Sequence, residues 1–435
     1  MRWLVCCYRW NAQINKCEII FSLRKTFQNS IFAAIFLNMD LLAQRLSKLT
    51  ESETLQMAKL SRELKAKGID IIDLSLGEPD FDTPQHIKDA AKKAIDDGYT
   101  KYTPVSGYLD LRVAISEKFK RENNLEFSAE QIVVSTGAKQ SLMNTMFSLL
   151  NAGDEVIVPS PYWVSYREMV KLADGITVEI KSDVESNFKI TAAQLEAAIT
   201  PKTKLFCFSS PCNPTGTVYT RDELKSFADV LEKYPDIIIV SDEIYEHINF
   251  LSAHESIAQF ENMKNRVVIV NGVSKAYAMT GWRIGYSASP IAVAKASDKI
   301  QGQITSGPSS ISQRASLAAL TGTQEPTTKM RDAYLQRRNL VASLLNEISG
   351  LKINKPDGAF YFFPEVSFFF GKKFNRTEIK NADDLCMYLI HEGRVSIVTG
   401  KAFGNGNCVR ISYATSEEKL REGMKRMKEA LQKLQ

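Results

Sequence analysis

The sequence predicts an α/β protein with a largely parallel sheet, together with a smaller α+β domain. Between residues 130 and 290, short apolar segments alternate with segments of helical pattern, as in parallel sheets whose helices cover both faces. The segment Ile237-Ile238-Ile239-Val240 is continuously apolar, which is typical of a strand buried on both sides. After about residue 326 the strands become shorter and helices flank them, which indicates a second domain.

The elements follow in order along the chain. Leucines recur at roughly helical spacing from Asp40 to about Ala66, which predicts an amphipathic arm and helix that end before Gly68. Thr83-Pro84 then predicts the start of a helix. Helices are expected around residues 138–150, 162–173 and 221–233. The strands expected from residue 71 to residue 288 are Ile71–Leu76, Ile132–Ser135, Glu155–Pro159, Leu205–Ser209, Ile237–Ser241, Val267–Asn271 and Ile284–Ala288.

The predicted elements suggest how the domains divide. A long helix at about 329–348 precedes short strands near residues 359–364, 395–398 and 408–412. We expect residues 85–325 to form the large domain and residues 326–435 to form a small C-terminal domain. The arm and first strand come before the large domain, so we expect residues 39–84 to supply an N-terminal arm and part of the small domain.

Composition limits the class of protein. The chain has 435 residues, of which 44% are hydrophobic and 24% are charged, which is ordinary for a soluble globular protein. The longest early apolar run, Ile31 to Leu37, is too short to cross a membrane. The net charge is +5, and residues 1–38 carry five Lys or Arg against one Glu, so they hold +4 of it and leave +1 for the rest. We therefore expect no membrane and no nucleic-acid partner.

Residues 1–38 differ from the rest of the sequence. They contain Cys6, Cys7 and Cys17 and lack the helical and capping patterns found downstream. A targeting segment would be basic in this way, but no apolar core followed by a small-residue cleavage site is present. We expect Met39 to be the true start and residues 1–38 to be an extension of doubtful status.

The remaining cysteines and the histidines show no pattern of a metal site or a disulfide framework. We therefore expect a reducing compartment, the cytoplasm, and no bound metal. These residues are Cys207, Cys212, Cys386 and Cys408, and His86, His247, His254 and His391.

Polar motifs follow several predicted strands at their carboxyl ends, where open α/β sheets bind ligands. Ser274-Lys275 follows one of these strands, and a lysine there could attack an aldehyde, although any single lysine is more often a surface residue. The other motifs are Asn213-Pro214-Thr215-Gly216, Ser241-Asp242-Glu243-Ile244-Tyr245 and Gly281-Trp282-Arg283-Ile284-Gly285-Tyr286. In this order and spacing, over residues 39–435, the chain resembles the class I aminotransferases of fold type I, close to the bacterial aspartate aminotransferase branch.

The resemblance implies pyridoxal 5'-phosphate as cofactor and a mainly parallel sheet of seven strands. It implies that Lys275 is catalytic and holds the cofactor as an imine, and that the Asp242 carboxylate faces the ring nitrogen. Asn213 and Tyr245 match the pair that binds the phenolic oxygen, and Trp163 matches the aromatic residue that stacks on the ring. Taken alone, Asp242 could be a helix cap, Asn213 a turn residue and Trp163 a core residue.

The resemblance also implies a phosphate site. Gly137 and Ala138 lie between a predicted strand and a helix, so their amides would meet the phosphate at the helix N-terminus. Arg283 matches the arginine that pairs with the phosphate, and Ser274 adds a hydroxyl. Tyr102 matches a tyrosine that reaches the neighbouring subunit's phosphate, which implies a homodimer with shared active sites. Gly272 stands where many relatives have a phosphate-binding serine.

For the substrate, Arg410 matches the arginine that binds the α-carboxylate, with Gly77, Trp163 and Asn213 as further contacts. Lys139 stands where related branches bind a distal carboxylate, which predicts amino-group transfer by a ping-pong mechanism between an acidic amino acid, aspartate first, and 2-oxoglutarate. Prephenate as the partner of glutamate or aspartate stays open, as does a lyase that uses the same cofactor. A regulatory module fused to a DNA-binding domain is disfavoured because residues 1–38 lack a helix-turn-helix pattern.

Overall fold

The computed structural model describes residues 43–51, 53–251 and 253–435. The predicted extension, residues 1–38, lies outside them, as do residues 40–42 of the predicted arm. The chain divides into two compact units, Met1–Thr50 and Glu51–Gln435. Within the described part of the first unit there is one short 3-10 helix, η1 (Gln44–Lys48). Everything that follows concerns the second unit.

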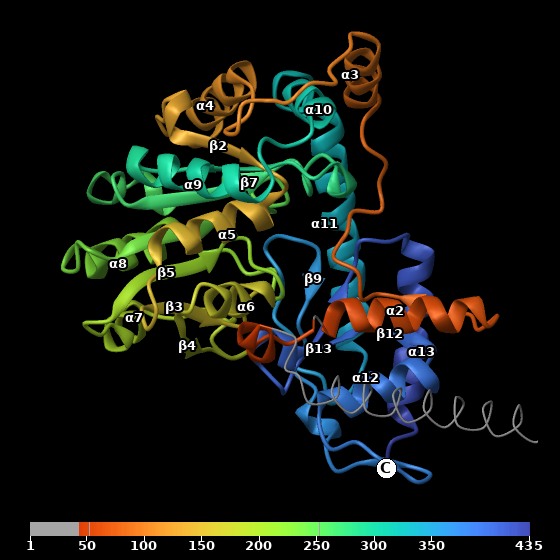
Figure 1. The fold of residues 1–435 in the computed structure, drawn as a ribbon. Coiled ribbons are helices and arrows are strands. Elements are labelled where there is room, and N and C mark those ends of the chain that lie inside the picture. The colour runs from red at the N-terminus through yellow and green to blue at the C-terminus, as the bar shows by residue number, and fades with distance from the viewer. Residues whose placement is uncertain (1–42, 52, 252) are drawn as a thin grey trace, which may run out of the picture. The chain divides into compact units, whose positions relative to one another are not determined.

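A seven-stranded mixed sheet forms the centre of this unit (Figure 1). Strand β8 runs antiparallel to its neighbours β2 and β7, whereas all other neighbouring pairs are parallel. In spatial order the strands are β2 (Ile132–Ser135), β8 (Gly285–Ala288), β7 (Val267–Gly272), β6 (Ile238–Asp242), β5 (Thr203–Ser209), β3 (Glu155–Ser160) and β4 (Ile176–Lys181). The predicted α/β class with a mainly parallel sheet of seven strands is thus confirmed.

Both faces of the sheet are buried. Successive residues of a strand point to opposite faces, and in β5 the side chains of Phe206 and Phe208 enter one core whereas Leu205 and Cys207 enter another. Figure 1 shows α5 and α6 in front of the sheet. The helices that surround it are α3 (Gln85–Asp96), α4 (Leu109–Asn123), α5 (Ala138–Leu149), α6 (Ser165–Leu172), α7 (Ala192–Ala198), α8 (Arg221–Glu232), α9 (Ile291–Ile304) and α10 (Ser310–Thr321).

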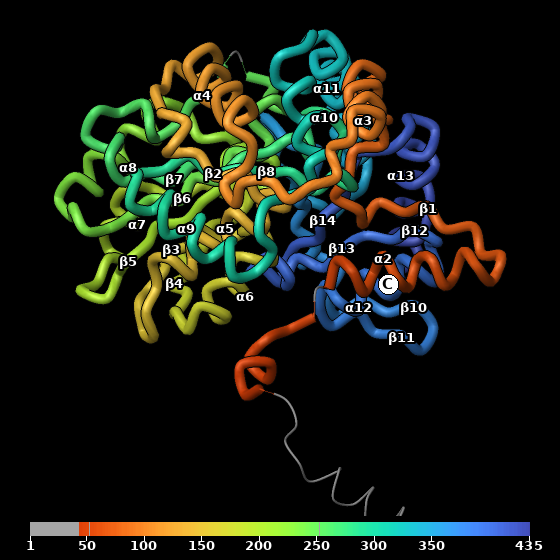
Figure 2. The backbone as a smooth tube through the Cα atoms, turned by 45° about the horizontal axis from the view of Figure 1, so that its top comes forward, coloured from red at the N-terminus to blue at the C-terminus, as the bar shows by residue number. Residues whose placement is uncertain are grey.

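A separate hydrophobic core joins segments from both ends of the second unit. Strand β1 (Ile72–Asp73) pairs in parallel with β12 (Val395–Ser396), and Figure 2 shows α2 (Glu53–Ala66) beside α12 (Ala382–His391). The remaining elements here are α11 (Glu325–Asn346), β9 (Tyr361–Phe362), β10 (Lys373–Phe374), β11 (Thr377–Glu378), β13 (Val398–Thr399), β14 (Val409–Ser412) and α13 (Glu417–Gln432). The division into domains at residues 84 and 325 stays a prediction.

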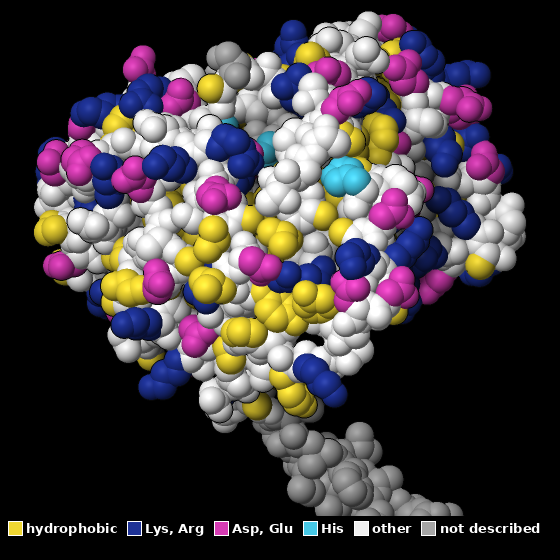
Figure 3. Space-filling model, turned by 90° about the horizontal axis from the view of Figure 1, so that it is seen from above, with side chains coloured by type: hydrophobic (Ala, Val, Ile, Leu, Met, Phe, Trp, Pro, Cys, Tyr) yellow, Lys and Arg dark blue, Asp and Glu magenta, His cyan; other side chains and the backbone are white. Residues whose placement is uncertain are grey.

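Short 3-10 helices complete the unit: η2 (Ala129–Gln131), η3 (Ile257–Gln259), η4 (Glu261–Met263), η5 (Thr280–Trp282), η6 (Ser367–Phe369) and η7 (Gly400–Phe403). Among the described residues, no helix combines the length and the apolar character that crossing a membrane requires. Figure 3 shows one face of the molecule, on which charged side chains of both signs are interspersed and hydrophobic side chains gather in one area.

Candidate active site

A pocket of about 280 Å³ lies where the polar motifs meet. Strands β5, β6 and β7 point their carboxyl ends toward it, and the N-terminus of α5 and strands β9 and β14 complete its walls. All but two of the predicted site residues line it: Gly77, Ala138, Lys139, Trp163, Asn213, Asp242, Tyr245, Ser274, Lys275, Arg283 and Arg410. Segments separated by more than 300 residues of sequence therefore meet here, since Arg410 bonds to the backbone of Ser75.

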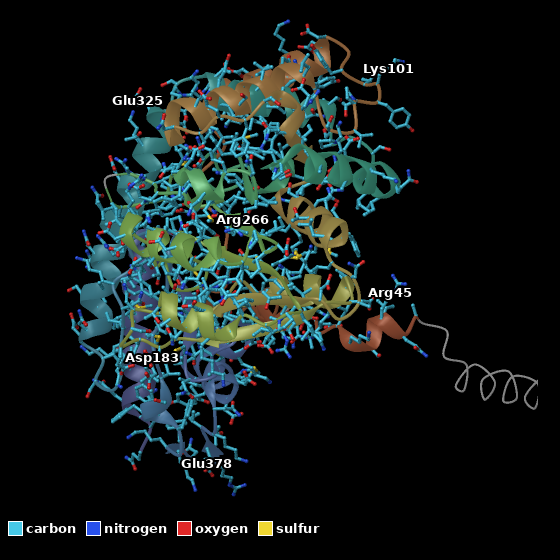
Figure 4. The ribbon with its side chains drawn as sticks, turned by 90° about the vertical axis from the view of Figure 1, so that its left-hand side faces the viewer. Arg45, Lys101, Asp183, Arg266, Glu325 and Glu378 are labelled. Atoms are coloured by element: carbon cyan, nitrogen blue, oxygen red, sulfur yellow. The ribbon has the colours of Figure 1, made fainter. Side chains whose placement is uncertain are left out.

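The two predicted residues outside the lining are Gly137 and Tyr102. Gly137 immediately precedes α5 with φ 83°, and a Cβ atom at this position would overlap the guanidinium of Arg283. Tyr102 is 99% exposed and takes no part in the pocket of its own chain. Its neighbour Lys101 is labelled in Figure 4, on a loop at the periphery of the molecule.

Lys275 follows strand β7 and points its amine into the pocket. Nζ donates a hydrogen bond to the carbonyl oxygen of Gly77 at 2.6 Å. Burial, reinforced by the positive charge of Arg410, lowers the pKa of this amine to about 8. A substantial fraction of Lys275 is therefore neutral near pH 8, which is the form that attacks a carbonyl carbon or removes a proton.

Asp242 ends strand β6 and is 5% exposed. Its carboxylate accepts hydrogen bonds from the Tyr166 hydroxyl at 2.6 Å and from the Ile244 backbone amide at 3.2 Å. Burial raises the pKa of Asp242 to about 6, although these two donors oppose the rise. A buried carboxylate held by neutral donors favours a cationic partner in the pocket.

Arg410 lies in β14 and is 2% exposed. Nη1 donates to the Asn213 side-chain oxygen at 3.1 Å, and Nη2 donates to the Ser75 carbonyl at 2.6 Å. Nε is buried without a hydrogen-bond partner, and the hydrogen bonds of this guanidinium within the described ranges go to Asn213 and Ser75, neither of which is acidic. Burial lowers the pKa of Arg410. A buried cation without a counter-ion is costly, so this group favours an anionic ligand with carboxylate geometry.

A second cationic area lies at the N-terminus of α5. Arg283 has a left-handed backbone, φ 57°, and Nη1 donates to the Thr280 carbonyl at 2.7 Å. Ser274 lines the same wall and provides a hydroxyl group, whereas the Thr280 hydroxyl donates to the Glu78 carboxylate at 2.9 Å. The free amides of a helix N-terminus, an arginine and a hydroxyl donor together suit a phosphate group. Gly272 lies in β7, where a Cβ atom would meet Gly285 Cα at 2.8 Å, so a serine would not fit there without a backbone shift.

Lys139, in the first turn of α5, lies beside this cationic area together with Trp163. Nζ of Lys139 is 5.0 Å from the Trp163 ring centroid, which is within the range of a cation–π contact. Partial burial and the nearby charge of Arg283 lower the pKa of Lys139. Arg283 is the charged group that acts on this amine, and no carboxylate in the described part of the chain pairs with it, which leaves it available to a ligand.

Sequence reasoning missed two tyrosines. Tyr166 holds Asp242, and Tyr361 in β9 lines the pocket between Tyr245 and Arg410. Tyr361 reaches the pocket because its strand pairs with the strand that carries Arg410. The sequence pattern does not reveal this pairing, so it gave no signal for Tyr361. Thr54 and Leu55, at the start of α2, also line the pocket and were not predicted.

Comparison with known proteins agrees with this site. The family model "Aminotransferase class I and II" matches residues 69–427. A probable aspartate/prephenate aminotransferase of Rhizobium leguminosarum is 50% identical over 393 residues, which cover 89% of this chain and 98% of the relative. An aspartate aminotransferase of Bacillus subtilis is 46% identical over 394 residues, covering 90% and 99%.

Solved structures show the same likeness. The aspartate aminotransferase of Rhizobium meliloti has a TM-score of 0.88 at 44% identity and covers 91% of this chain and all of its own. That of Thermus thermophilus with maleate has a TM-score of 0.84 at 40% identity, covering 90% and 100%. The chain therefore belongs to the class I and II aminotransferase family, with the α/β architecture of fold type I.

Proposed function

We propose that this protein is a pyridoxal-phosphate-dependent aminotransferase that moves the amino group between an acidic L-amino acid, with aspartate preferred, and 2-oxoglutarate. The observation that carries the proposal is the buried guanidinium of Arg410, which has no acidic partner among the described residues and shares one pocket with the Lys275 amine. An amine beside a carboxylate-binding arginine suits an amino-acid substrate.

The residues present fit pyridoxal phosphate. The cradle at Gly137, which a Cβ atom would fill with a clash against Arg283, and the amides of α5 suit the phosphate. Asp242 suits a protonated ring nitrogen, whose positive charge would favour the ionised carboxylate. Trp163 offers a face for the ring, and Asn213 and Tyr245 would bind its phenolic oxygen.

When bound, pyridoxal phosphate supplies an electron sink that stabilises negative charge on the α-carbon of the amino acid. Arg410 would hold the α-carboxylate through its free Nε and a second nitrogen, which fixes the orientation of the α-carbon. Lys275, with a pKa of about 8, would remove the α-proton and return a proton as general base and acid. Trp163 would exclude water from one side of the reacting atoms.

The substrate class depends on Lys139. Its amine is near the pocket wall with no acidic partner in the described ranges, so a distal carboxylate of the substrate would pair with it. Several relatives are named aspartate/prephenate aminotransferases, which supports prephenate as a second amino acceptor. Aspartate and prephenate each carry a second carboxylate besides the one that Arg410 would bind. A lyase reaction at the same site is the less favoured alternative.

A half-reaction panel tests the proposal. The purified enzyme with cofactor is mixed with single amino acids, and the loss of the cofactor's visible absorbance is followed, then its return with 2-oxoglutarate or prephenate. We expect aspartate and glutamate to react faster than phenylalanine or alanine, and steady-state kinetics to show the parallel lines of a ping-pong mechanism. Equal rates for acidic and aromatic amino acids would contradict the substrate assignment. Oxo-acid release that needs no acceptor would show a lyase.

We also propose a homodimer in which Tyr102 completes the partner's phosphate site. The support is its 99% exposure and its absence from the pocket of its own chain. Lys275→Ala and Tyr102→Ala chains, mixed and reassembled, should form hybrids that contain one intact site, so activity should exceed the sum of the separate variants. Activity equal to that sum would contradict shared sites.

The cytoplasm is the proposed location. Cys207, Cys212, Cys386 and Cys408, the described cysteines, are all free thiols, which suits a reducing compartment. Cell fractionation with antibody detection tests this, and recovery of the protein from a secreted fraction would contradict it.

A further inference from the structure

Tyr361 connects the two halves of the pocket. Its hydroxyl oxygen lies 2.7 Å from that of Tyr245, and both side chains are buried. Its ring centroid lies 4.6 Å from the guanidinium carbon of Arg410. The strand pairing explains the second contact, because Tyr361 in β9 is opposite Ser412 in β14, two residues from Arg410. One side chain thus contacts both the residue proposed for the phenolic oxygen and the residue proposed for the α-carboxylate.

Either hydroxyl can be the donor in the hydrogen bond between the two tyrosines. Two hydroxyls share one hydrogen between them, and the accepting tyrosine keeps its own hydrogen for another acceptor. Within residues 43–51, 53–251 and 253–435, Tyr245 is the one hydrogen-bond partner of the Tyr361 hydroxyl. If Tyr361 donates, Tyr245 stays free to donate to an oxygen in the pocket.

The position of Arg410 favours this direction. Its guanidinium carbon lies 4.6 Å from the Tyr361 ring centroid. Burial raises the pKa of both tyrosines, and the charge of Arg410 opposes the rise in each. A cation packed against a phenol makes its hydroxyl a better donor, which favours Tyr361 as the donor to Tyr245. A hydroxyl that accepts a hydrogen bond becomes a stronger donor in turn.

We propose that Tyr361 is a positioning residue whose hydroxyl orients Tyr245 as a donor toward the cofactor's phenolic oxygen and whose ring supports the guanidinium of Arg410. The inference rests on the proposed function, since it concerns the same cofactor and substrate. The two roles belong to different parts of one side chain, so different substitutions separate them.

The first test concerns the hydroxyl. The pH titration of the bound cofactor's visible absorbance is measured for the wild type, Tyr361→Phe, Tyr245→Phe and the double variant. A donor to the phenolic oxygen stabilises negative charge there, so its loss should raise the apparent pKa of the bound cofactor. Tyr361→Phe should raise that pKa by about half a unit, because a polarised donor is only partly weakened. It should add no shift in the Tyr245→Phe background.

The second test concerns the ring. Equilibrium binding of maleate to the cofactor-loaded enzyme is compared for Tyr361→Phe and Tyr361→Leu. Phenylalanine keeps the aromatic face under Arg410, so its dissociation constant should stay within about twofold of the wild type, whereas leucine should raise it about tenfold. Maleate binding to Tyr361→Leu equal to that of the wild type would overturn the role of the ring. Should Tyr361→Leu fail to fold, the hydroxyl test still decides the first role.

The outcomes separate this inference from the proposed function. A wild-type protein that binds no pyridoxal phosphate would contradict the proposed function. A wild type with bound cofactor, a clear shift in Tyr245→Phe and none in Tyr361→Phe would overturn the inference alone. An additive shift in the double variant would also overturn it, because Tyr361 would then act on the cofactor independently of Tyr245.

Discussion

The hydroxyl of Tyr166 donates a hydrogen bond to Oδ2 of Asp242 at 2.6 Å, within the core that α6 forms against the sheet. This tyrosine is fully buried, and a charged partner would have been costly there. The neutral Tyr166 hydroxyl satisfies one carboxylate oxygen without neutralising the negative charge of Asp242. That charge can therefore pair with a cationic group of a ligand. Asp242 still has a pKa raised to about 6 by burial, so its charge depends on pH near neutrality.

Replacement of Tyr166 by phenylalanine should weaken cofactor binding and make it more sensitive to acid. The loss of a donor raises the pKa of Asp242 above its value of about 6, and the ionised carboxylate is the form that pairs with a protonated ring nitrogen. In the wild type, affinity of the apoenzyme for pyridoxal phosphate should fall as pH drops through about 6. In Tyr166→Phe the fall should begin at higher pH, with about tenfold weaker binding at neutral pH.

Equilibrium titration of the apoenzyme with the cofactor across this pH range measures the effect. Tyr162→Phe is the matched control, because the Tyr162 hydroxyl donates to Glu179 at 2.7 Å and Tyr162 does not line the pocket. An identical pH dependence in Tyr166→Phe and the wild type would show that Asp242 does not need this donor.

The covalent capture of pyridoxal phosphate by the apoenzyme should follow the titration of Lys275. Burial lowers the pKa of this amine to about 8, and the neutral amine is the nucleophile. The rate of capture should therefore rise with pH through about 8 and then level off. Stopped-flow absorbance measures this rate. A midpoint near the ordinary lysine value of 10.5 would contradict the lowered pKa.

Lys275→Ala provides the control for capture. It removes the amine but leaves Asp242, Arg283 and the α5 amides, so it should bind the cofactor without covalent capture and without turnover. Normal turnover in Lys275→Ala would contradict the catalytic role of this lysine.

The fold was predictable where sequence pattern reflects burial on both faces. Strand β6 contains most of the continuously apolar run Ile237–Val240 and was predicted, whereas β4 lies at the sheet edge, is largely half-exposed and was missed. The motifs predicted residues that the structure brings into one pocket. Tyr166 and Tyr361 carry no motif, and their partners are 76 and 116 residues away in sequence, so only the folded arrangement identifies them.

Lys139 should determine the preference for acidic substrates. Lys139→Met removes the cation that would pair with a distal carboxylate, so kcat/KM for aspartate should fall about ten- to hundredfold while that for alanine changes little. Lys139→Arg keeps the charge and should retain most of the preference. The preference should decline as pH rises, because Lys139 then loses its charge. The pKa of Lys139 is lowered, so this decline should begin at a lower pH than with an ordinary lysine.

Competition between aspartate and alanine in one reaction mixture measures this preference directly. An unchanged ratio of the two rates in Lys139→Met would contradict the assignment. A fall in both rates by the same factor would indicate a general defect of the pocket, because alanine has no distal carboxylate.

Gly77 should be intolerant of a side chain because of Tyr361. A Cβ atom at Gly77 would lie 2.5 Å from the Tyr361 hydroxyl oxygen, while the next atom, Cζ, would be 3.5 Å away. Gly77→Ala should therefore displace Tyr361, lower the thermal stability of the enzyme and weaken maleate binding through Arg410. Overpacking of this kind costs about 1–3 kcal/mol.

The conflict concerns one oxygen atom, so its removal should relieve it. Gly77→Ala combined with Tyr361→Phe should recover stability relative to Gly77→Ala alone, because the nearest remaining contact is an ordinary van der Waals distance. Gly281→Ala is the matched control, since a Cβ atom there meets nothing within 4 Å. Thermal unfolding and maleate binding are measured for the wild type, Gly77→Ala, Tyr361→Phe and the double variant, which form a double-mutant cycle. A double variant no more stable than Gly77→Ala would place the conflict elsewhere, because the hydroxyl is the atom that phenylalanine lacks.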